Sequence, residues 1–166
     1  MQHIRDWRLS DAEDLARAIG DKSVQDNLRD GIPFPYSPRD AEEFIGSVLA
    51  APAGSLYAWA IQHEGQAVGS IGLTRQGNVH RLTAELGYYL AEPHWGRGIV
   101  TAAIREACEY VFENTDIVRI FAEPFSHNLA SRRVLEKAGF AREGTMRKNV
   151  IKNGEIMDME LYALVR

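Results

Sequence analysis

The chain has 166 residues, of which 45% are hydrophobic and 25% are charged, and this composition is typical of one folded domain. Its net charge of −4 comes without a basic stripe, which argues against a nucleic-acid partner, and its apolar runs fall far short of the ~20 residues that span a membrane. The first residues lack a secretion signal, and the single cysteine, Cys108, cannot form an internal disulfide, so we expect a cytoplasmic protein.

Two amphipathic helices are predicted in the first third of the chain. Ser10 and Glu13 have the spacing of a capping box, which opens a helix that ends at Gly20. Ser37 and Pro38 open the second helix. Its apolar face repeats with a period of 3.6 residues and comprises Ala41, Phe44, Ile45, Val48 and Leu49.

The period of the pattern then changes to two, which predicts strands. Residues 55–63 and 66–74 form two strands joined by a turn at Glu64-Gly65. Residues 82–91 form a third strand, whose successive side chains point to opposite faces. One face carries Leu82, Ala84, Leu86, Tyr88 and Leu90, and the other carries Thr83, Glu85, Gly87 and Tyr89.

A long helix is predicted over residues 98–114, with an apolar stripe of Ile99/Val100, Ala103/Ile104, Ala107/Cys108 and Val111/Phe112. A strand at 117–123, a helix at about 127–138 and two final strands that turn at Asn153-Gly154 follow. This order predicts an α+β fold in a single domain, residues 1–166. Its sheet is mixed and largely antiparallel, with one parallel pair where the long helix crosses over.

The junction between the third strand and the long helix has the features of a phosphate site. Trp95-Gly96-Arg97-Gly98 forms the turn, and the first N–H groups of the helix have no partner within it. Glycines let backbone amides approach a phosphate closely, and Arg97 adds a cation. The plain alternative is that the two glycines only make a tight turn.

Three phosphate sites compete for this segment. A Walker loop needs a lysine that Gly98-Ile-Val-Thr101 lacks. A dinucleotide fingerprint nearly matches, with Thr101 as its third position, but it belongs after the first strand of a βαβ chain rather than after a meander. The third is an acyl-coenzyme A site.

The wider sequence resembles the Gcn5-related N-acetyltransferase family, in its RimJ/RimL-like branch. The matching segments are Ala84-Glu-Leu-Gly-Tyr88, Trp95-Gly-Arg-Gly98, Asn128-Leu-Ala-Ser131, Val134-Leu-Glu-Lys-Ala-Gly-Phe140, Glu143-Gly144 and Lys152-Asn-Gly154. The resemblance implies a central sheet of about six to seven strands flanked by about four helices. It also implies acetyl-CoA as co-substrate, with no metal, and the five histidines show no ligand spacing.

The resemblance assigns the cofactor residues. Backbone amides of the glycine loop and the helix start hold the pyrophosphate, and the pantetheine arm lies along the strand near Tyr89 and Leu90. The cofactor candidates are Tyr89, Leu90, Trp95, Gly96, Arg97, Gly98, Ile99, Val100, Thr101 and Asn128. The sequence departs from the family pattern at Pro93, which replaces a Gln or Arg at the start of the loop, so Arg97 gains importance.

Two catalytic candidates follow from the same resemblance. Glu85 matches a base that takes a proton from the amine, often through water, although a solvated glutamate on a half-exposed strand is the alternative. Ser131 matches a group that protonates the departing thiolate, because the family's alternative Tyr position holds Leu135. Asn128 either contacts the cofactor or only caps a helix.

Two further assignments stay open. Some RimL-like members have an acidic residue at the position of Val150 in this chain. The proton must therefore be taken up by Glu85, by water, or by Glu155 or Asp158. Phe34 and Tyr36 in the 28–36 loop, with Trp59, either wall the acceptor site or pack in the core.

The predicted reaction is direct acetyl transfer from acetyl-CoA to a primary amine. Resemblance favours the α-amine of a protein N-terminus, such as that of a ribosomal protein, while small amines and polyamines remain open. The rival from another class is an acyl-CoA-binding module without catalysis. A homodimer is also left open.

Overall fold

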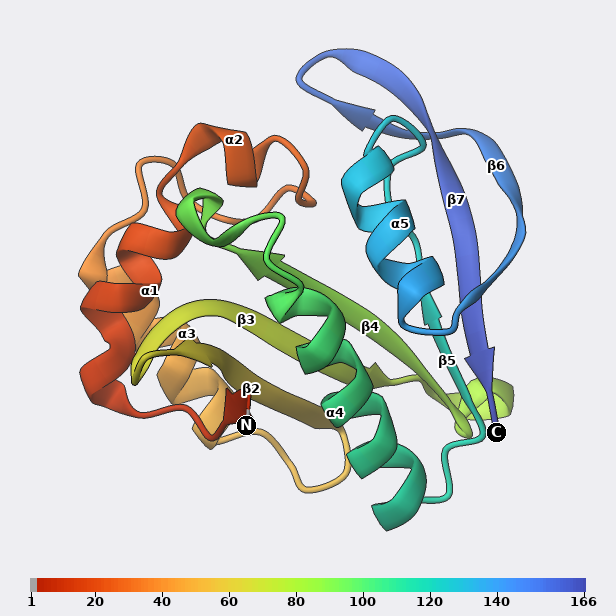
Figure 1. The fold of residues 1–166 in the computed structure, drawn as a ribbon, viewed down its shortest axis with the longest axis horizontal. Coiled ribbons are helices and arrows are strands. Elements are labelled where there is room, and N and C mark those ends of the chain that lie inside the picture. Colours follow the sequence, from red (N-terminus) through yellow and green to blue (C-terminus); the bar gives the residue numbers. More distant parts are fainter. Residues whose placement is uncertain (1–2) are drawn as a thin grey trace.

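The computed structural model describes residues 3–166 (Figure 1). Its helices are α1 (Ala12–Ile19), α2 (Lys22–Gln25), α3 (Pro38–Leu49), α4 (Ile99–Asn114) and α5 (Leu129–Lys137). Its strands are β1 (Ile4–Arg5), β2 (Leu56–His63), β3 (Gln66–Arg75), β4 (Thr83–Leu90), β5 (Arg119–Ala122), β6 (Ala141–Lys152) and β7 (Glu155–Val165).

The strands form one seven-stranded sheet in the order β1-β2-β3-β4-β5-β7-β6, and only the β4–β5 pair is parallel among the described residues. The predicted α+β fold with a mixed, largely antiparallel sheet is therefore confirmed. Helix α2 has four residues, too few for a periodic signal, and the sequence pattern does not predict it.

Helices cover both faces of the sheet (Figure 1). Helices α4 and α5 pack on one face through the predicted stripe of α4, of which Ile104 and Val111 are fully buried. Helices α1 and α3 pack on the other face around Leu15 and Ile45. Each such side chain contributes about 1.5–3 kcal/mol by burial. In the described part of the chain, no helix has the length and hydropathy to cross a bilayer.

The predicted capping box at Ser10 and Glu13 is wrong. A 3-10 turn, Leu9–Asp11, precedes α1, and the acidic residue at its end is Asp11. The Asp11 carboxylate accepts hydrogen bonds from the Arg8 backbone N–H at 2.9 Å and from the Arg5 guanidinium at 2.7 and 2.8 Å. The cap is therefore formed two residues earlier than predicted, by Arg8 and Asp11, and Arg5 of β1 also holds the Asp11 carboxylate.

The predicted alternation of the third strand is confirmed within β4. Ala84, Leu86 and Leu90 are buried against α4, while Glu85 faces the other side of the sheet. Leu82 is the exception, because it precedes β4 and is 39% exposed.

Strands β4 and β5 separate after a short stretch of pairing. Only Thr83–Glu85 of β4 pair with Arg119–Phe121 of β5, although β4 continues to Leu90. Strand β5 ends at Ala122, and Pro124 cannot donate to a ladder because it has no backbone N–H. The second half of β4 therefore has no strand beside it on that edge.

Candidate active site

A cavity of about 770 Å³ passes through the sheet where β4 and β5 separate. The glycine loop and the starts of α4 and α5 line it on one face, and strands β2–β4 with the segment around α2 line it on the other. All the catalytic and cofactor candidates lie on its wall: Glu85, Ser131, Tyr89, Leu90, Trp95, Gly96, Arg97, Gly98, Ile99, Val100, Thr101 and Asn128. The structure thus brings these residues together at one opening.

The glycine loop is shaped for close approach by a ligand. Gly96 and Gly98 have φ values of +73° and +78°, which disfavour side chains, and an added Cβ at either position would face open space beyond its neighbours in the chain, as far as the described residues show. Gly98 is the N-cap of α4, and its carbonyl accepts from the Ala102 N–H at 3.1 Å. The N–H groups of Ile99, Val100 and Thr101 precede that first intrahelical bond and point from the positive end of the helix dipole.

Two side chains hold this loop in place. The indole N–H of Trp95 donates to the Leu90 carbonyl at 2.7 Å, which ties the loop to the end of β4. Nη2 of Arg97 lies 3.2 Å from Nε2 of His63, which connects the loop to the end of β2. Burial, then His63 and Arg97, lowers the pKa of His94, whose Nδ1 has no partner among the described residues. This region therefore stays electropositive mainly through Arg97 and the helix start.

Glu85 is part of a charge cluster that the sequence does not reveal. Nη2 of Arg29 donates to Oε1 of Glu85 at 2.5 Å and to Oε2 of Glu123 at 3.1 Å. Burial raises the pKa of Glu123, the Glu85 carboxylate raises it further, and Arg29 partly lowers it. This cluster therefore joins two carboxylates through one guanidinium on the face opposite α4.

The floor beside Glu85 is hollow because it is built from small residues. Gly72 of β3 pairs with Gly87 of β4, and both line the cavity. Ala58 of β2 lies opposite Gly72 and completes this floor. A substrate group therefore has room next to the Glu85 carboxylate.

Ser131 and Tyr88 form a hydroxyl pair on the other side of the gap. Their oxygens lie 2.6 Å apart, and Tyr88 also donates to the Ser131 carbonyl at 3.3 Å. Burial raises the pKa of Tyr88 to about 12, although its bond to Ser131 lowers it. The pair therefore keeps its protons at neutral pH. A tyrosine within a buried aliphatic row needs a polar partner, and that signal could have singled out Tyr88.

Asn128 caps α5. Its Oδ1 accepts from the Ser131 backbone N–H at 3.1 Å, as an N-cap residue does. It also lines the cavity, so a cofactor contact stays a prediction beside the observed cap.

The aromatic candidates do not form the cavity wall. Phe34 is 60% exposed, and Tyr36 packs beside the α1–α3 core, where burial and then the charge of Asp40 raise its pKa to about 12. Trp59 lies on the α4 side against Tyr110. The wall of the acceptor side comes instead from Phe44 with Val24, Leu28, Ile32 and Val48. Loop composition does not show which side chains turn inward.

The alternative acidic candidates also lie outside this cavity. Asp158 accepts from the Lys148 backbone N–H at 2.7 Å, in the irregular part of the β6–β7 pair. Glu155 is exposed beside the turn between these strands. The carboxylate that shares Arg29 with Glu85 is Glu123, which lies directly after β5 and lines the cavity.

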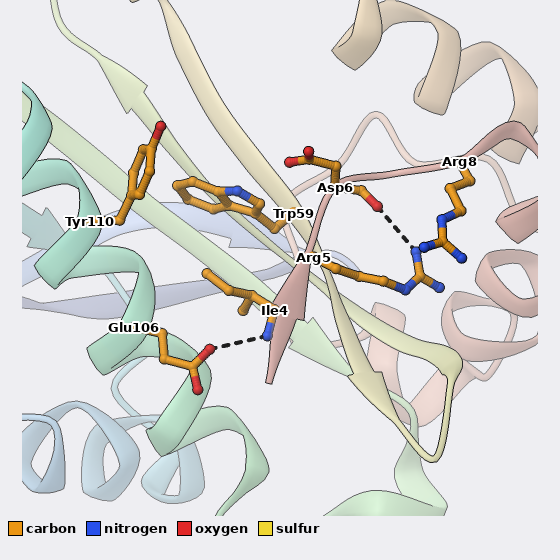
Figure 2. A pocket seen from close by; sticks show the side chains of 7 residues that line it. All are labelled: Ile4, Arg5, Asp6, Arg8, Trp59, Glu106 and Tyr110. Carbon is orange, nitrogen blue, oxygen red and sulfur yellow. Dashed lines mark hydrogen bonds between the residues drawn. The ribbon is translucent and has the colours of Figure 1, made fainter. Parts of the chain in front are cut away.

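A second cavity of about 620 Å³ lies between β1, β2 and α4 (Figure 2). Trp59 and Tyr110 meet edge to face there, and the Glu106 carboxylate accepts from the Ile4 N–H at 3.3 Å. Its Arg5 is held by Asp11. These contacts fix the N-terminal strand on the sheet. Within residues 3–166, no group of three or more His, Cys, Asp or Glu side chains is placed to hold a metal.

The chain belongs to the acetyltransferase (GNAT) domain family, whose profile matches residues 3–141. It is 46% identical over 83 residues to the "Probable N-acetyltransferase YjcK" of Bacillus subtilis. That match covers 50% of this chain and 46% of YjcK, so it spans under half of that relative. It is also 27% identical to the ribosomal-protein-serine acetyltransferase of Escherichia coli, over 80% of this chain and 74% of that one.

Solved structures bear the same fold. RimJ of Mycobacterium smegmatis, solved in complex with CoA-disulfide, superposes with a TM-score of 0.87 at 24% identity and covers 98% of this chain and 80% of that one. The predicted resemblance to the family is confirmed, with RimJ and RimL among its structural neighbours.

Proposed function

We propose that this protein is an acetyl-CoA-dependent N-acetyltransferase that acts on a primary amine. The observation that carries the proposal is the cavity through the β4–β5 gap, which joins the glycine loop on one face to Glu85 and Glu123 on the other. A cofactor site alone would not need carboxylates across the sheet. The non-catalytic alternative therefore leaves half of the cavity unexplained.

The residues of the first face fit coenzyme A. The N–H groups of Ile99, Val100 and Thr101 would hold its pyrophosphate, with Arg97 adding charge. The open edge of β4 at Tyr89 and Leu90 would pair with the pantetheine amides, as exposed strand edges do with other extended chains. Acetyl-CoA then supplies the acetyl group as a thioester.

The residues of the second face fit an amine. An ammonium cannot attack a thioester, so a base must take its proton, and Glu85 lines the cavity beside the small residues of the floor. On the other side of the gap, the Tyr88–Ser131 pair holds protons that could pass to the departing thiolate. Direct transfer needs a base near the amine and a proton donor near the sulfur, and these two groups are the candidates for those roles.

The acceptor we propose is the α-amine of a protein N-terminus. This rests on the name of the Escherichia coli relative and on the two carboxylates, which suit a cationic amine. The test is a screen of free-amine peptides, polyamines and amino acids for release of coenzyme A. Faster release with small amines than with any peptide would replace the peptide proposal, and no release with any amine would favour the binding module.

Acetyl-CoA is expected to raise the melting temperature more than NADH or ATP does. At ~100 times its dissociation constant a ligand stabilises by about 2.7 kcal/mol, which corresponds to about 5–10 °C for a chain of this size. Differential scanning fluorimetry with the three ligands at equal concentration measures this. A larger rise in melting temperature with NADH would favour the dinucleotide-binding interpretation of the glycine loop instead.

Ser131→Ala is expected to lower kcat about five- to tenfold with little change in the KM for acetyl-CoA, and Tyr88→Phe should do the same. A hydrogen bond made only in the transition state affects kcat, and one such bond is worth about 1–1.5 kcal/mol. The effect stays modest because a thiolate with a pKa near ~8.5 leaves readily. Steady-state kinetics with a weakly basic acceptor should show the decrease in kcat most clearly.

Asn128→Ala is the matched control on the same turn of helix. It should raise the KM for acetyl-CoA and cost about 1 kcal/mol of stability through the lost cap, with a smaller effect on kcat. Parental turnover in Ser131→Ala would mean that the thiolate leaves without this donor.

A further inference from the structure

Arg29 contacts two carboxylates through one nitrogen. A single nitrogen, Nη2, lies 2.5 Å from Glu85 and 3.1 Å from Glu123, whereas a guanidinium commonly uses two nitrogens as a fork toward a carboxylate. One nitrogen between two carboxylates is the contact pattern of an ammonium. All three side chains line the cavity where the acceptor amine is proposed to bind.

The exposure of these groups favours an exchangeable cation. The Arg29 side chain is 57% exposed, while Glu85 and Glu123 are 25% and 23% exposed. Arg29 can therefore swing into water at little cost, since exposed ion pairs are weak. The two carboxylates stay behind, and the charge of Glu85 adds to burial in raising the pKa of Glu123, so another cation between them is favoured in its place.

The loop that carries Arg29 is tied down on both sides. Asp30 pairs with Lys152 at 2.8 Å, and Asp26 accepts from Asn153 at 3.1 Å, both at the tip of the β6–β7 pair. The Asn27 amide donates to the Ser23 carbonyl at 3.0 Å. These contacts connect the backbone around Arg29 to the β6–β7 tip, whereas the exposed Arg29 side chain is held, within the described part of the chain, only by its two carboxylate contacts.

We propose that Arg29 occupies the place of the acceptor ammonium between Glu85 and Glu123, and that the acceptor must displace it to bind. This rests on the proposed function and adds two residues to it. Glu123 becomes a second ligand of the substrate amine, and Arg29 becomes an internal competitor that selects for cationic amines. An acceptor without a free amine gains nothing from displacing Arg29.

Arg29→Met tests this, because Met keeps much of the length and loses the charge. The probe is the peptide Ser-Ala-Ala amide with a free N-terminus, titrated by calorimetry into enzyme saturated with coenzyme A. We expect its affinity to rise about two- to fivefold in Arg29→Met, since the competing state is removed. With acetyl-CoA, the KM for the peptide should fall by the same factor while the KM for acetyl-CoA stays unchanged.

Three controls separate displacement from general charge effects. Arg39→Met removes an arginine from the exposed Arg39–Glu43 pair of α3, away from the cavity, and should leave peptide affinity unchanged. Arg29→Lys keeps a competing cation and should resemble the parent. Glu123→Gln added to Arg29→Met should cancel the gain, because the ammonium then loses one of its two carboxylates.

Unchanged or weaker binding of the free-amine peptide in Arg29→Met would overturn the proposal. An equal gain for the N-acetylated peptide would also overturn it, since that peptide has no ammonium. The binding titration does not depend on turnover. Tighter binding in Arg29→Met without coenzyme A release in any variant would therefore support the displacement while rejecting the acetyltransferase.

Discussion

Glu85→Gln is expected to lower kcat about 10²-fold or more, and to leave the affinity for acetyl-CoA nearly unchanged. General base catalysis contributes about 10²–10⁴-fold, and glutamine keeps the size of the side chain while losing the proton acceptor. Glu85 faces the acceptor side of the sheet, whereas the cofactor loop contacts the other face. The substitution should therefore separate proton transfer from cofactor binding.

The pH–rate profile distinguishes the base from a structural role. The acidic limb of kcat/KM should flatten in Glu85→Gln, measured with two acceptors of different basicity because the amine itself also titrates. Glu123→Gln is the matched comparison. Burial, with Glu85 beside it, raises the pKa of Glu123, so this carboxyl holds its proton to higher pH than an exposed glutamate. Parental profiles in Glu85→Gln, with a large loss in Glu123→Gln, would transfer the base role to Glu123.

Gly98→Asn is expected to weaken coenzyme A binding about 10- to 100-fold, which corresponds to about 1.4–2.8 kcal/mol, roughly the worth of one or two amide contacts. A side chain at this position would enter the open space in front of the amides of Ile99 and Val100. Asparagine tolerates the φ of +78° better than a branched residue does, so the variant should still fold. Calorimetric titration with coenzyme A measures the loss.

Gly154→Asn provides the matched control for backbone strain. Gly154 has a φ of +80° and open space around it, but it lies in the β6–β7 turn away from the cavity. The melting temperature should fall by a similar amount in both variants, because a non-glycine residue with a positive φ costs about 1–3 kcal/mol of stability. Only Gly98→Asn should show a weaker affinity for coenzyme A. Equal binding by the two variants would mean that Gly96 and Gly98 only make a turn.

Features that depend on neighbouring residues in the chain were predictable. The alternation of β4 and the stripe of α4 repeat with the periods of a strand and a helix, and burial follows those periods closely. The glycine loop was also predictable, because two glycines directly before a helix indicate a turn whose backbone has a positive φ. The position of Glu85 on the polar side of its strand follows from the same alternation.

The partners of the candidate residues were not predictable in this way. Arg29 and Glu85 are 56 residues apart in the sequence, and Tyr88 and Ser131 are 43 apart. Phe34 and Tyr36 show the converse, because an aromatic loop suggests a pocket wall whereas the wall is made by Phe44 of α3. A side chain's partner depends on how elements pack, and no local pattern contains that information.

The sequence by itself determined the main helices and strands, the glycine turn before α4 and the family, because each rests on periodicity, backbone restriction or ordered motifs along the chain. Only the tertiary structure decided that β5 pairs with no more of β4 than Thr83–Glu85. It also decided that the gap between these strands opens into one cavity and that Arg29 bridges Glu85 to Glu123. The physical reason is that two parallel strands need a crossover connection, and here that connection contains α4. The packing of α4 on the sheet therefore sets the register of β4 and β5.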